Sequence, residues 1–418
     1  MKTMDETREK IRERVLEEIP AGVEINDDEL MEIIEREIEQ AAKDCYIRLE
    51  KKKEIRHLIF NSIRKMDVLQ DILEDEEITE IMVNGPDHIF VEREGKLRET
   101  GMKFEHQGRL EDIAQQIASE GNRIVNESNP ILDARLADGS RVNIVVPPIA
   151  IEGPVITIRK FPKEAMTMKK LIQMGAVTEE VEEFLRKLVE AKYNIFISGG
   201  TGAGKTTFLN ILSNFIPHNE RVITIEDSAE LQIQNIDNLV RLEARNANVE
   251  GKNEVTIRDL VKSALRMRPD RIIVGEIRDA AAIDLLTAMN TGHDGSLSTG
   301  HANSPADMLN RLETLVLMGM DIPLAAIRQQ IASGIDLVVH LGRLRDKSRK
   351  VLEVTEVGGV SEGKIRLFPL YVFEESGEKD GRVLGELKAT GQKLRAVDKC
   401  RRAGVEVAGM ENREGRLV

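Results

Sequence analysis

The sequence of 418 residues contains no tryptophan and two cysteines, and aromatic residues make up only 3% of it. So few aromatic side chains leave little surface on which single-stranded bases could stack. Cys45 and Cys400 stand far apart and form no CxxC pair. Neither a zinc ribbon nor a disulfide framework is therefore indicated, and a reducing cytoplasm fits.

Long apolar runs are also missing. Nowhere do about 18 apolar residues follow one another, and residues 1–14 alternate charges where a signal peptide would carry an apolar segment. We therefore expect a cytoplasmic protein that reaches the inner face of the cell membrane only as a peripheral component. The net charge of −13 argues against a general affinity for nucleic acid, although a local basic groove is compatible with it.

The apolar pattern predicts an α/β protein in five parts. Residues 1–73 show helical spacing, which predicts a charged helical N-terminal region. Residues 74–161 predict a small α/β lobe, and residues 162–178 a hinge or linker. Residues 179–375 alternate helices with short unbroken apolar runs, which suit strands buried on both faces of a mainly parallel sheet. Residues 376–418 predict a polar C-terminal tail with a short helix.

The clearest motif lies between an apolar strand and an apolar helix and fits GxxxxGK[ST]. Its glycines let backbone N–H groups curl around phosphates at a helix N-terminus, which favours negative charge. We expect Lys205 to reach the β- and γ-phosphates of ATP, and the hydroxyl of Thr206 to bind Mg²⁺. The predicted nucleotide-binding loop consists of Gly199, Gly200, Thr201, Gly202, Ala203, Gly204, Lys205, Thr206 and Thr207.

Two further buried strands end in carboxylates. Glu276 follows the apolar run 272–274 and so stands at the end of a buried strand. A carboxylate at this position can hold the water shell of Mg²⁺, so we predict Glu276 as a metal residue together with Thr206. Glu226 and Glu230 follow the strand at 222–225. A carboxylate beside the γ-phosphate can orient the attacking water, and we predict Glu226 first and Glu230 second for this catalytic role. A structural or exposed acid is the alternative for each.

Two of the seven histidines, His293 and His301, lie eight positions apart among small residues. Small neighbours suggest tight packing next to a ligand. We predict that His301 hydrogen-bonds the γ-phosphate or a catalytic acid and so reports hydrolysis, and that His293 contributes to nucleotide binding. A structural histidine is the alternative for either residue.

The order of these elements resembles a known family. A phosphate-binding loop, an acidic box, a strand ending in Gly-Glu and a histidine box follow one another as in the secretion ATPase superfamily of type II and type IV secretion and pilus assembly. The segments 78–86, 136–141 and 202–207 resemble its CpaF branch, the assembly ATPases of Tad or Flp-type pili. Ser228, where many relatives have proline, also favours that branch. With two cysteines, the chain cannot carry the tetracysteine zinc site of other members.

The resemblance implies a homo-hexamer whose subunits have a PAS-like N-terminal lobe and a RecA-like P-loop NTPase lobe. It implies ATP and Mg²⁺ as cofactors and a polytopic inner-membrane platform protein as partner, with pilin-like substrates reached indirectly. The acidic balance and the scarce aromatics count against direct contact with nucleic acid. Arg135, Arg141 and Arg159 resemble the family's mobile arginines, which swing onto the γ-phosphate when the lobes close. We predict a catalytic role for them, with the segment 161–163 as hinge; salt bridges within the lobe are the alternative.

The leading hypothesis is thus a hexameric ATP-hydrolysing motor that powers assembly of a Tad/Flp-type pilus or related type II or IV secretion. A conjugation or DNA-uptake motor of the same superfamily and a nucleotide-gated scaffold with little turnover are the alternatives. The basic residues Arg343, Arg345, Lys347, Arg349 and Lys350 allow a phospholipid or partner site, but we expect a solvated turn between domains.

Overall fold

The computed structural model describes residues 4–19, 25–44, 46–93, 95–121, 123–161, 166–245, 247 and 252–407. Contacts divide the chain into two compact units, Met1–Lys163 and Glu164–Val418. Several residues of the sequence predictions lie outside the described residues, namely Cys45, the hinge residues Pro162 and Lys163, and residues 408–418 of the predicted tail.

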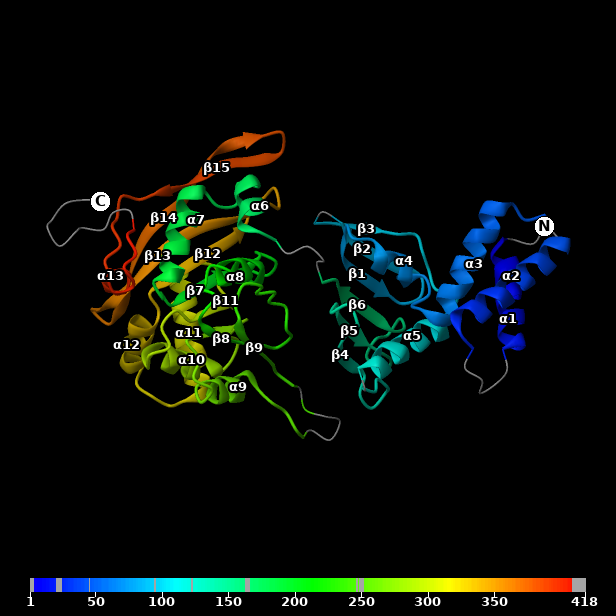
Figure 1. Ribbon diagram of the computed structural model, residues 1–418, viewed down its shortest axis with the longest axis horizontal. Helices are drawn as coiled ribbons and strands as arrows, with labels where there is room; N and C mark the ends of the chain where they lie inside the picture. Colours follow the sequence, from blue (N-terminus) through cyan, green and yellow to red (C-terminus); the bar gives the residue numbers. More distant parts are fainter. Residues whose placement is uncertain are drawn as a thin grey trace. The chain divides into compact units, whose positions relative to one another are not determined.

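The first unit begins with three helices, α1 (Met4–Glu18), α2 (Asp27–Asp44) and α3 (Leu49–Arg64), which are blue in Figure 1. Their buried residues recur three or four positions apart, as in Leu30, Ile34 and Ile38 of α2, so each helix contributes one apolar stripe to a shared core. Asn26 and Glu29 bond each other's backbone N–H and fix the start of α2.

An antiparallel sheet with two helices on one face completes the first unit. Its elements are α4 (Leu69–Glu74), β1 (Ile78–Asn84), β2 (His88–Arg93), β3 (Lys96–Glu99), α5 (Gln107–Glu120), β4 (Ile131–Arg135), β5 (Arg141–Val145) and β6 (Val155–Arg159), with strand order β3-β2-β1-β6-β5-β4. Buried and exposed residues alternate along its strands. Core residues such as Ile144 and Ile156 pack with Ile113 and Ile117 of α5 on one face of the sheet.

The second unit holds a nine-stranded sheet between two layers of helices (Figure 1). Its elements are α6 (Met168–Gln173), α7 (Glu179–Glu190), β7 (Ile195–Gly199), α8 (Lys205–Ser213), β8 (Arg221–Glu226), β9 (Asn238–Glu243), α9 (Ile257–Ala264), β10 (Arg271–Val274), α10 (Ala281–Asn290), β11 (Leu297–His301), α11 (Pro305–Gly319), α12 (Leu324–Gly334), β12 (Leu337–Arg343), β13 (Arg349–Ser361), β14 (Lys364–Lys379), β15 (Arg382–Ala389) and α13 (Asp398–Ala403). The strand order is β15-β14-β13-β12-β7-β11-β10-β8-β9. The six strands from β12 to β9 in that order are parallel, and β13, β14 and β15 extend the sheet antiparallel.

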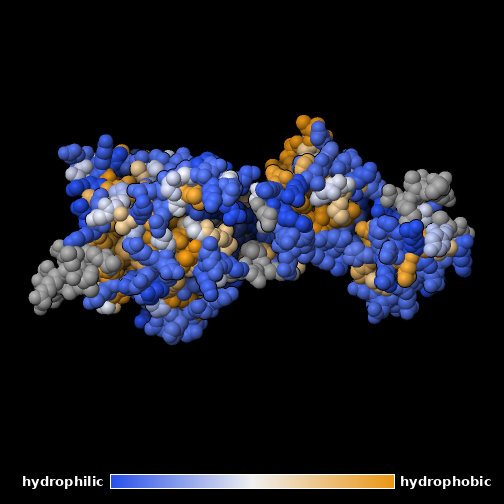
Figure 2. All heavy atoms as spheres, turned by 90° about the horizontal axis from the view of Figure 1, so that it is seen from above, coloured by the Kyte–Doolittle hydropathy of each residue, from blue (hydrophilic) through white to orange (hydrophobic). Residues whose placement is uncertain are grey.

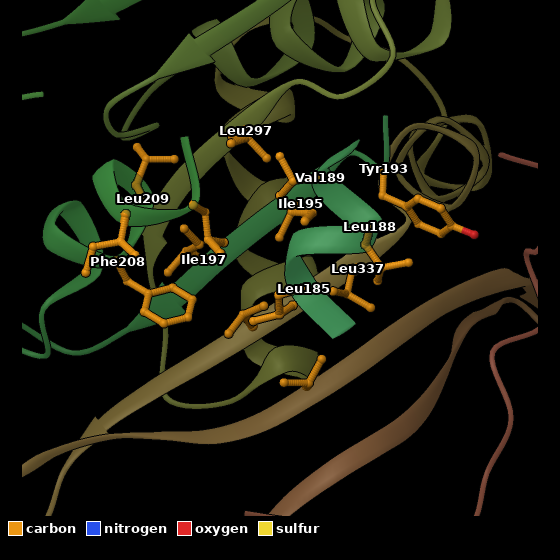
Figure 3. Packing of buried hydrophobic residues seen from close by; sticks show 14 of the residues in the cluster. Leu185, Leu188, Val189, Tyr193, Ile195, Ile197, Phe208, Leu209, Leu297 and Leu337 are labelled. Carbon is orange, nitrogen blue, oxygen red and sulfur yellow. The ribbon is translucent and has the colours of Figure 1, made fainter. Parts of the chain in front are cut away.

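Helices cover both faces of the parallel part, which is why its strands read as unbroken apolar runs. Helices α7, α8 and α13 pack on one face, where Leu188, Ile197 and Phe208 share a core (Figure 3). Helices α9 to α12 pack on the other face with residues such as Ile223 and Ile272. The parallel strands therefore end together at one edge, between the two helical layers.

Two predicted boundaries need correction. The predicted linker 162–178 contains helix α6, and the sheet continues to Ala389, well beyond residue 375 where a tail was expected to begin. Strand β15 was not predicted because it is an edge strand in which five of the eight residues are exposed, so it carries no apolar run. No helix among the described residues is long and apolar enough to span a membrane, and hydrophilic side chains dominate the face drawn in Figure 2.

Candidate active site

The glycine-rich loop connects the end of β7 to the start of α8. Gly199 lies so close to the neighbouring strand β12 that a Cβ there would be 2.5 Å from the carbonyl oxygen of Leu341. Gly204 caps α8 with φ at 93°, in the left-handed region that favours glycine. Between these two positions the loop turns back on itself, and the Lys205 ammonium donates to the carbonyl oxygen of Gly200 at 3.1 Å.

Lys205 also contacts the histidine at the end of the adjacent strand. His301 is the last residue of β11, which pairs with β7 so that His301 lies opposite Gly199. Nδ1 of His301 is 3.2 Å from the Lys205 Nζ. Because an ammonium can only donate, Nδ1 accepts, and the ring carries its proton on Nε2. Burial lowers the pKa of His301, and the nearby Lys205 charge adds to this, so the neutral ring is favoured.

The other ring nitrogen faces the predicted Mg²⁺ acid. His301 Nε2 lies 2.9 Å from Glu276 Oε1, a close contact between a neutral ring and a carboxylate that does not meet hydrogen-bond geometry. Glu276 Oε2 accepts a 2.7 Å hydrogen bond from Arg278. Lys205, His301 and Glu276 therefore form one continuous chain of contacts along the carboxyl edge of the sheet.

Glu226 lies on the next strand, directly beside Glu276. Its Cγ would be 3.0 Å from a Cβ on Gly275, so the glycine before Glu276 makes room for it. One carboxylate oxygen of Glu226 accepts from the N–H groups of Glu230 and Leu231 at 2.8 and 3.0 Å, whereas the other is buried without a hydrogen-bond partner. Burial raises the pKa of Glu226, and the two backbone bonds oppose this. Glu226 thus anchors the following loop, a role that the sequence did not reveal.

The structure does not bring His293 to this edge. Strand β11 runs from Leu297 to His301, and Leu297 pairs with Ile195 at the start of β7. His293 precedes β11, where its carbonyl oxygen accepts from Ser296 Oγ, so it lies at the opposite edge of the sheet from the glycine-rich loop. The eight-residue spacing of the two histidines spans the sheet, and the prediction that both lie beside one nucleotide needs this correction.

The predicted arginines are brought together within the first unit. Arg135 pairs across the strands with Arg141, and Arg141 with Arg159, so the three form a row over β4, β5 and β6. Neighbouring strands lie about 4.8 Å apart, and like charges directly opposite each other are unfavourable unless an anion is near. Glu80 of β1 continues the row opposite Arg159.

The basic segment near Arg345 also differs from the expectation. It is the β12–β13 turn inside the second unit and not a solvated link between domains. Arg345 forms ion pairs with Glu375 and Glu378 of β14, and Lys350 is buried. Arg349 donates its Nε–H to the carbonyl oxygen of Gly202 in the glycine-rich loop at 2.9 Å.

Sequence reasoning missed another buried group beside the loop. His340 of β12 places Nδ1 2.8 Å from the hydroxyl of Ser198, the residue before Gly199, and burial lowers its pKa. No motif pointed to His340, because only the pairing of β12 with β7 sets it beside the loop.

A lysine that reaches into a glycine loop at the carboxyl edge of a parallel sheet is the arrangement with which P-loop NTPases hold nucleotide phosphates. The second unit is of this class. The chain belongs to the family described as type II/IV secretion system protein, whose model matches residues 62–408.

Individual relatives agree with this assignment. A putative conjugal transfer protein of Mycobacterium tuberculosis is 33% identical over 326 residues, which are 77% of this chain and 92% of that one. The type IV secretion system protein VirB11 of Bartonella henselae is 31% identical over 71% of this chain and 92% of its own. The pilus retraction motor PilT with bound ADP has the same fold, at a TM-score of 0.50 and 16% identity, over 81% of this chain and 87% of that one.

These comparisons confirm three predictions. The fold is α/β with N-terminal helices and a RecA-like ATPase lobe. The chain is a member of the type II/IV secretion ATPase superfamily, and it is an ATPase that binds nucleotide. The roles of the individual site residues stay predictions.

Proposed function

We propose that this ATPase is a motor of protein secretion or pilus assembly, and more narrowly the assembly ATPase of a Tad/Flp-type pilus. The observation that carries the motor is the contact chain Lys205–His301–Glu276, which links the phosphate-binding lysine to the acid proposed to hold the metal shell. The narrower assignment rests on the CpaF-like segments 78–86 and 202–207.

The residues present suit Mg²⁺. Glu276 Oε1 is buried without a hydrogen-bond partner, and a carboxylate oxygen of this kind can receive a metal-bound water. Thr206, at the start of α8, would supply its hydroxyl as direct ligand. When bound, the ion would neutralise charge on the β- and γ-phosphates.

Nucleotide binding then changes the contacts of the site. Lys205 leaves His301 and Gly200 to reach the phosphates. Nδ1 of the neutral His301 can then accept a hydrogen bond from another donor. Glu226 keeps one oxygen on the backbone at Glu230 and offers the other toward the attacking water. His301 would thereby report the presence of the γ-phosphate to Glu276.

The arginine row supplies the second half of the proposed mechanism. Three guanidinium groups on neighbouring strands form a concentrated positive site, and Arg135, Arg141 and Arg159 would bind the γ-phosphate when the two lobes close. Loss of the γ-phosphate would let the lobes separate. We propose this opening and closing as the source of force.

Assembly and location complete the proposal. A homo-hexamer would dock on a polytopic platform protein at the cytoplasmic face of the inner membrane and act on pilin-like substrates through it. Co-purification of the chain with the platform protein encoded beside it tests this partner. Pilin and platform genes next to its own gene are the expected finding, and conjugation genes in their place would remove the Tad/Flp assignment.

A conjugation motor is the second candidate, because the relatives in Mycobacterium tuberculosis and Sinorhizobium fredii are named conjugal transfer proteins. Fluorescence anisotropy with single- and double-stranded DNA at about 0.1 M salt separates the two, since direct DNA binding should weaken steeply with salt. Weak binding is expected here. Phosphate release by the purified chain, compared with a Glu276→Gln variant, separates either motor from a scaffold with little turnover.

A further inference from the structure

The phosphate-binding loop receives a side chain from far along the sequence. Arg349, the first residue of β13, donates Nε–H to the carbonyl oxygen of Gly202, 147 positions away, at 2.9 Å. Its Cδ would lie 3.7 Å from a Cβ on Gly204. The arginine therefore contacts the loop at two places, the carbonyl oxygen of Gly202 and the backbone beside Gly204.

The loop has little else to hold its middle. A Cβ on Gly200 or Gly202 would meet nothing within 4 Å, and Gly202 has φ at 70°. Inside the loop, the Ala203 N–H and the Lys205 ammonium both donate to the carbonyl oxygen of Gly200, at 3.3 and 3.1 Å. Glycine backbone without packed side chains loses much conformational entropy when it is fixed in one conformation. Hydrogen bonds from residues outside the loop can offset this cost and so help to fix the loop conformation.

The direction of the Gly202 carbonyl matters for phosphate binding. The peptide plane that carries this carbonyl also carries the N–H of Ala203 on its opposite side. When Arg349 holds the oxygen on one side, the Ala203 N–H is held on the other side of the plane, where it donates to the carbonyl oxygen of Gly200 while no nucleotide is bound. Phosphate oxygens accept backbone N–H groups of this kind in such loops. Without the arginine this peptide can rotate and turn its carbonyl oxygen, in place of its N–H group, toward the phosphates.

Arg349 is itself held in a braced turn. Arg345, four residues earlier, bonds Glu375 at 2.7 Å and Glu378 at 3.0 Å on β14. Asp346 accepts the backbone N–H of Val383 on β15 at 2.8 Å. The turn between β12 and β13 is therefore fastened to the β14–β15 hairpin, which limits how far Arg349 can move.

We propose that Arg349 is a positioning residue of the ATP site, which preorganises the phosphate-binding loop by holding the Gly202 peptide. It acts on affinity for the nucleotide and not on the cleavage step, because its partner is the loop backbone. The inference rests on the proposal that the loop from Gly199 to Thr207 binds the phosphates.

The test measures binding of a fluorescent ADP analogue and steady-state ATP hydrolysis by the full chain. Arg349→Ala should raise the Kd for ADP and the KM for ATP about tenfold, the scale of one hydrogen bond to a charged group, while kcat at saturation stays within about twofold. Arg349→Lys keeps the charge but not the planar Nε donor and should recover only part of the affinity. Lys347→Gln, which removes an exposed cation from the same turn, is the matched control and should bind as wild type.

Other results would overturn the inference. Equal affinities for Arg349→Ala and Lys347→Gln would refute it, as would a fall in kcat with KM unchanged. Wild-type affinity in Arg349→Lys would show that the positive charge of Arg349 matters and that its hydrogen bond to Gly202 does not. Circular dichroism melts of each variant exclude misfolding as the cause of a weaker affinity. If Lys205→Ala binds the ADP analogue with normal affinity, the assignment of the site itself is wrong. If Lys205→Ala binds weakly but Arg349→Ala binds normally, the assignment of the site holds and only the role of Arg349 is refuted.

Discussion

The strand that leads to Glu276 begins with Arg271, which forms a buried ion pair with Glu220 and allows a quantitative test of the fold. Arg271 is 0% exposed, and its guanidinium bonds both oxygens of Glu220 at 2.7 and 2.9 Å and the carbonyl oxygen of Val189 at 2.6 Å. Glu220→Ala removes both charged bonds and leaves the guanidinium buried with one acceptor. Removing one partner of such a buried pair costs roughly 3–5 kcal/mol.

The expected shift in melting temperature follows from the size of the unit. For about 250 residues, 1 kcal/mol shifts Tm by roughly 2–4 °C, so a loss of about 4 kcal/mol should lower Tm by roughly 8–16 °C. The chain has no tryptophan, so the melt is followed by circular dichroism, with residual ATPase activity after heating as a readout specific to the second unit.

An exposed pair on the neighbouring helix provides the control. Arg186 and Glu190 of α7 lie 2.9 Å apart with side chains 37% and 34% exposed, and Glu190→Gln should cost no more than about 0.5 kcal/mol. Replacing both members of the buried pair by apolar residues should recover much of the lost stability, because no charge is then left unpaired. The control variant should melt no more than about 2 °C below wild type. If Glu220→Ala also melts within about 2 °C of wild type, the reasoning on this pair is wrong.

Three further predictions concern catalysis. Lys205→Ala should abolish ATP hydrolysis and weaken nucleotide binding, because it removes the cation nearest the phosphates; wild-type phosphate release would contradict the site. Glu276→Gln should keep ATP bound but slow its cleavage, since the isostere preserves shape but disturbs Mg²⁺, and a collapse of affinity with normal turnover per bound ATP would count against this role. Alanine at Arg135, Arg141 or Arg159 should leave ADP affinity nearly unchanged and lower hydrolysis by roughly 10³-fold, as for arginine fingers; a parallel loss of ADP and ATP binding with normal turnover at saturation would exclude lobe closure.

The sequence predicted three of the strands that are buried on both faces, but not β12, which is also buried. Strands β7, β8 and β10 read as unbroken apolar runs because helices cover them on each side. Strand β11 was missed, since its buried residues are small and polar; a Cβ on Gly300 would be 2.6 Å from the Met308 side chain, so packing and not hydrophobicity selects the residue there. Edge strands β9 and β15 lack an apolar run for a similar reason, because solvent reaches them.

The same distinction holds for the site. Lys205, Glu276 and His301 were predictable as neighbours because the carboxyl ends of parallel strands meet at one edge of a sheet. Arg349 was not, since β12 and β13 are antiparallel and their register decides which residue of a basic turn faces the loop. The anchoring role of Glu226 likewise depends on two backbone bonds that no residue pattern encodes.

The strand order arranges these groups in a line. From β8 through β10, β11, β7 and β12 to β13, neighbouring strands bring Glu226, Glu276, His301, the phosphate-binding loop and Arg349 to one edge of the sheet. Five strand spacings of about 4.8 Å make this line about 24 Å long, with the loop near its middle. Under the proposed function, a phosphate entering the loop would draw Lys205 away from His301 on one side and act on the Gly202 peptide held by Arg349 on the other. In the proposed mechanism, nucleotide binding would therefore act in two directions from a single site, on His301 and Glu276 on one side and on the turn braced by the β14–β15 hairpin on the other.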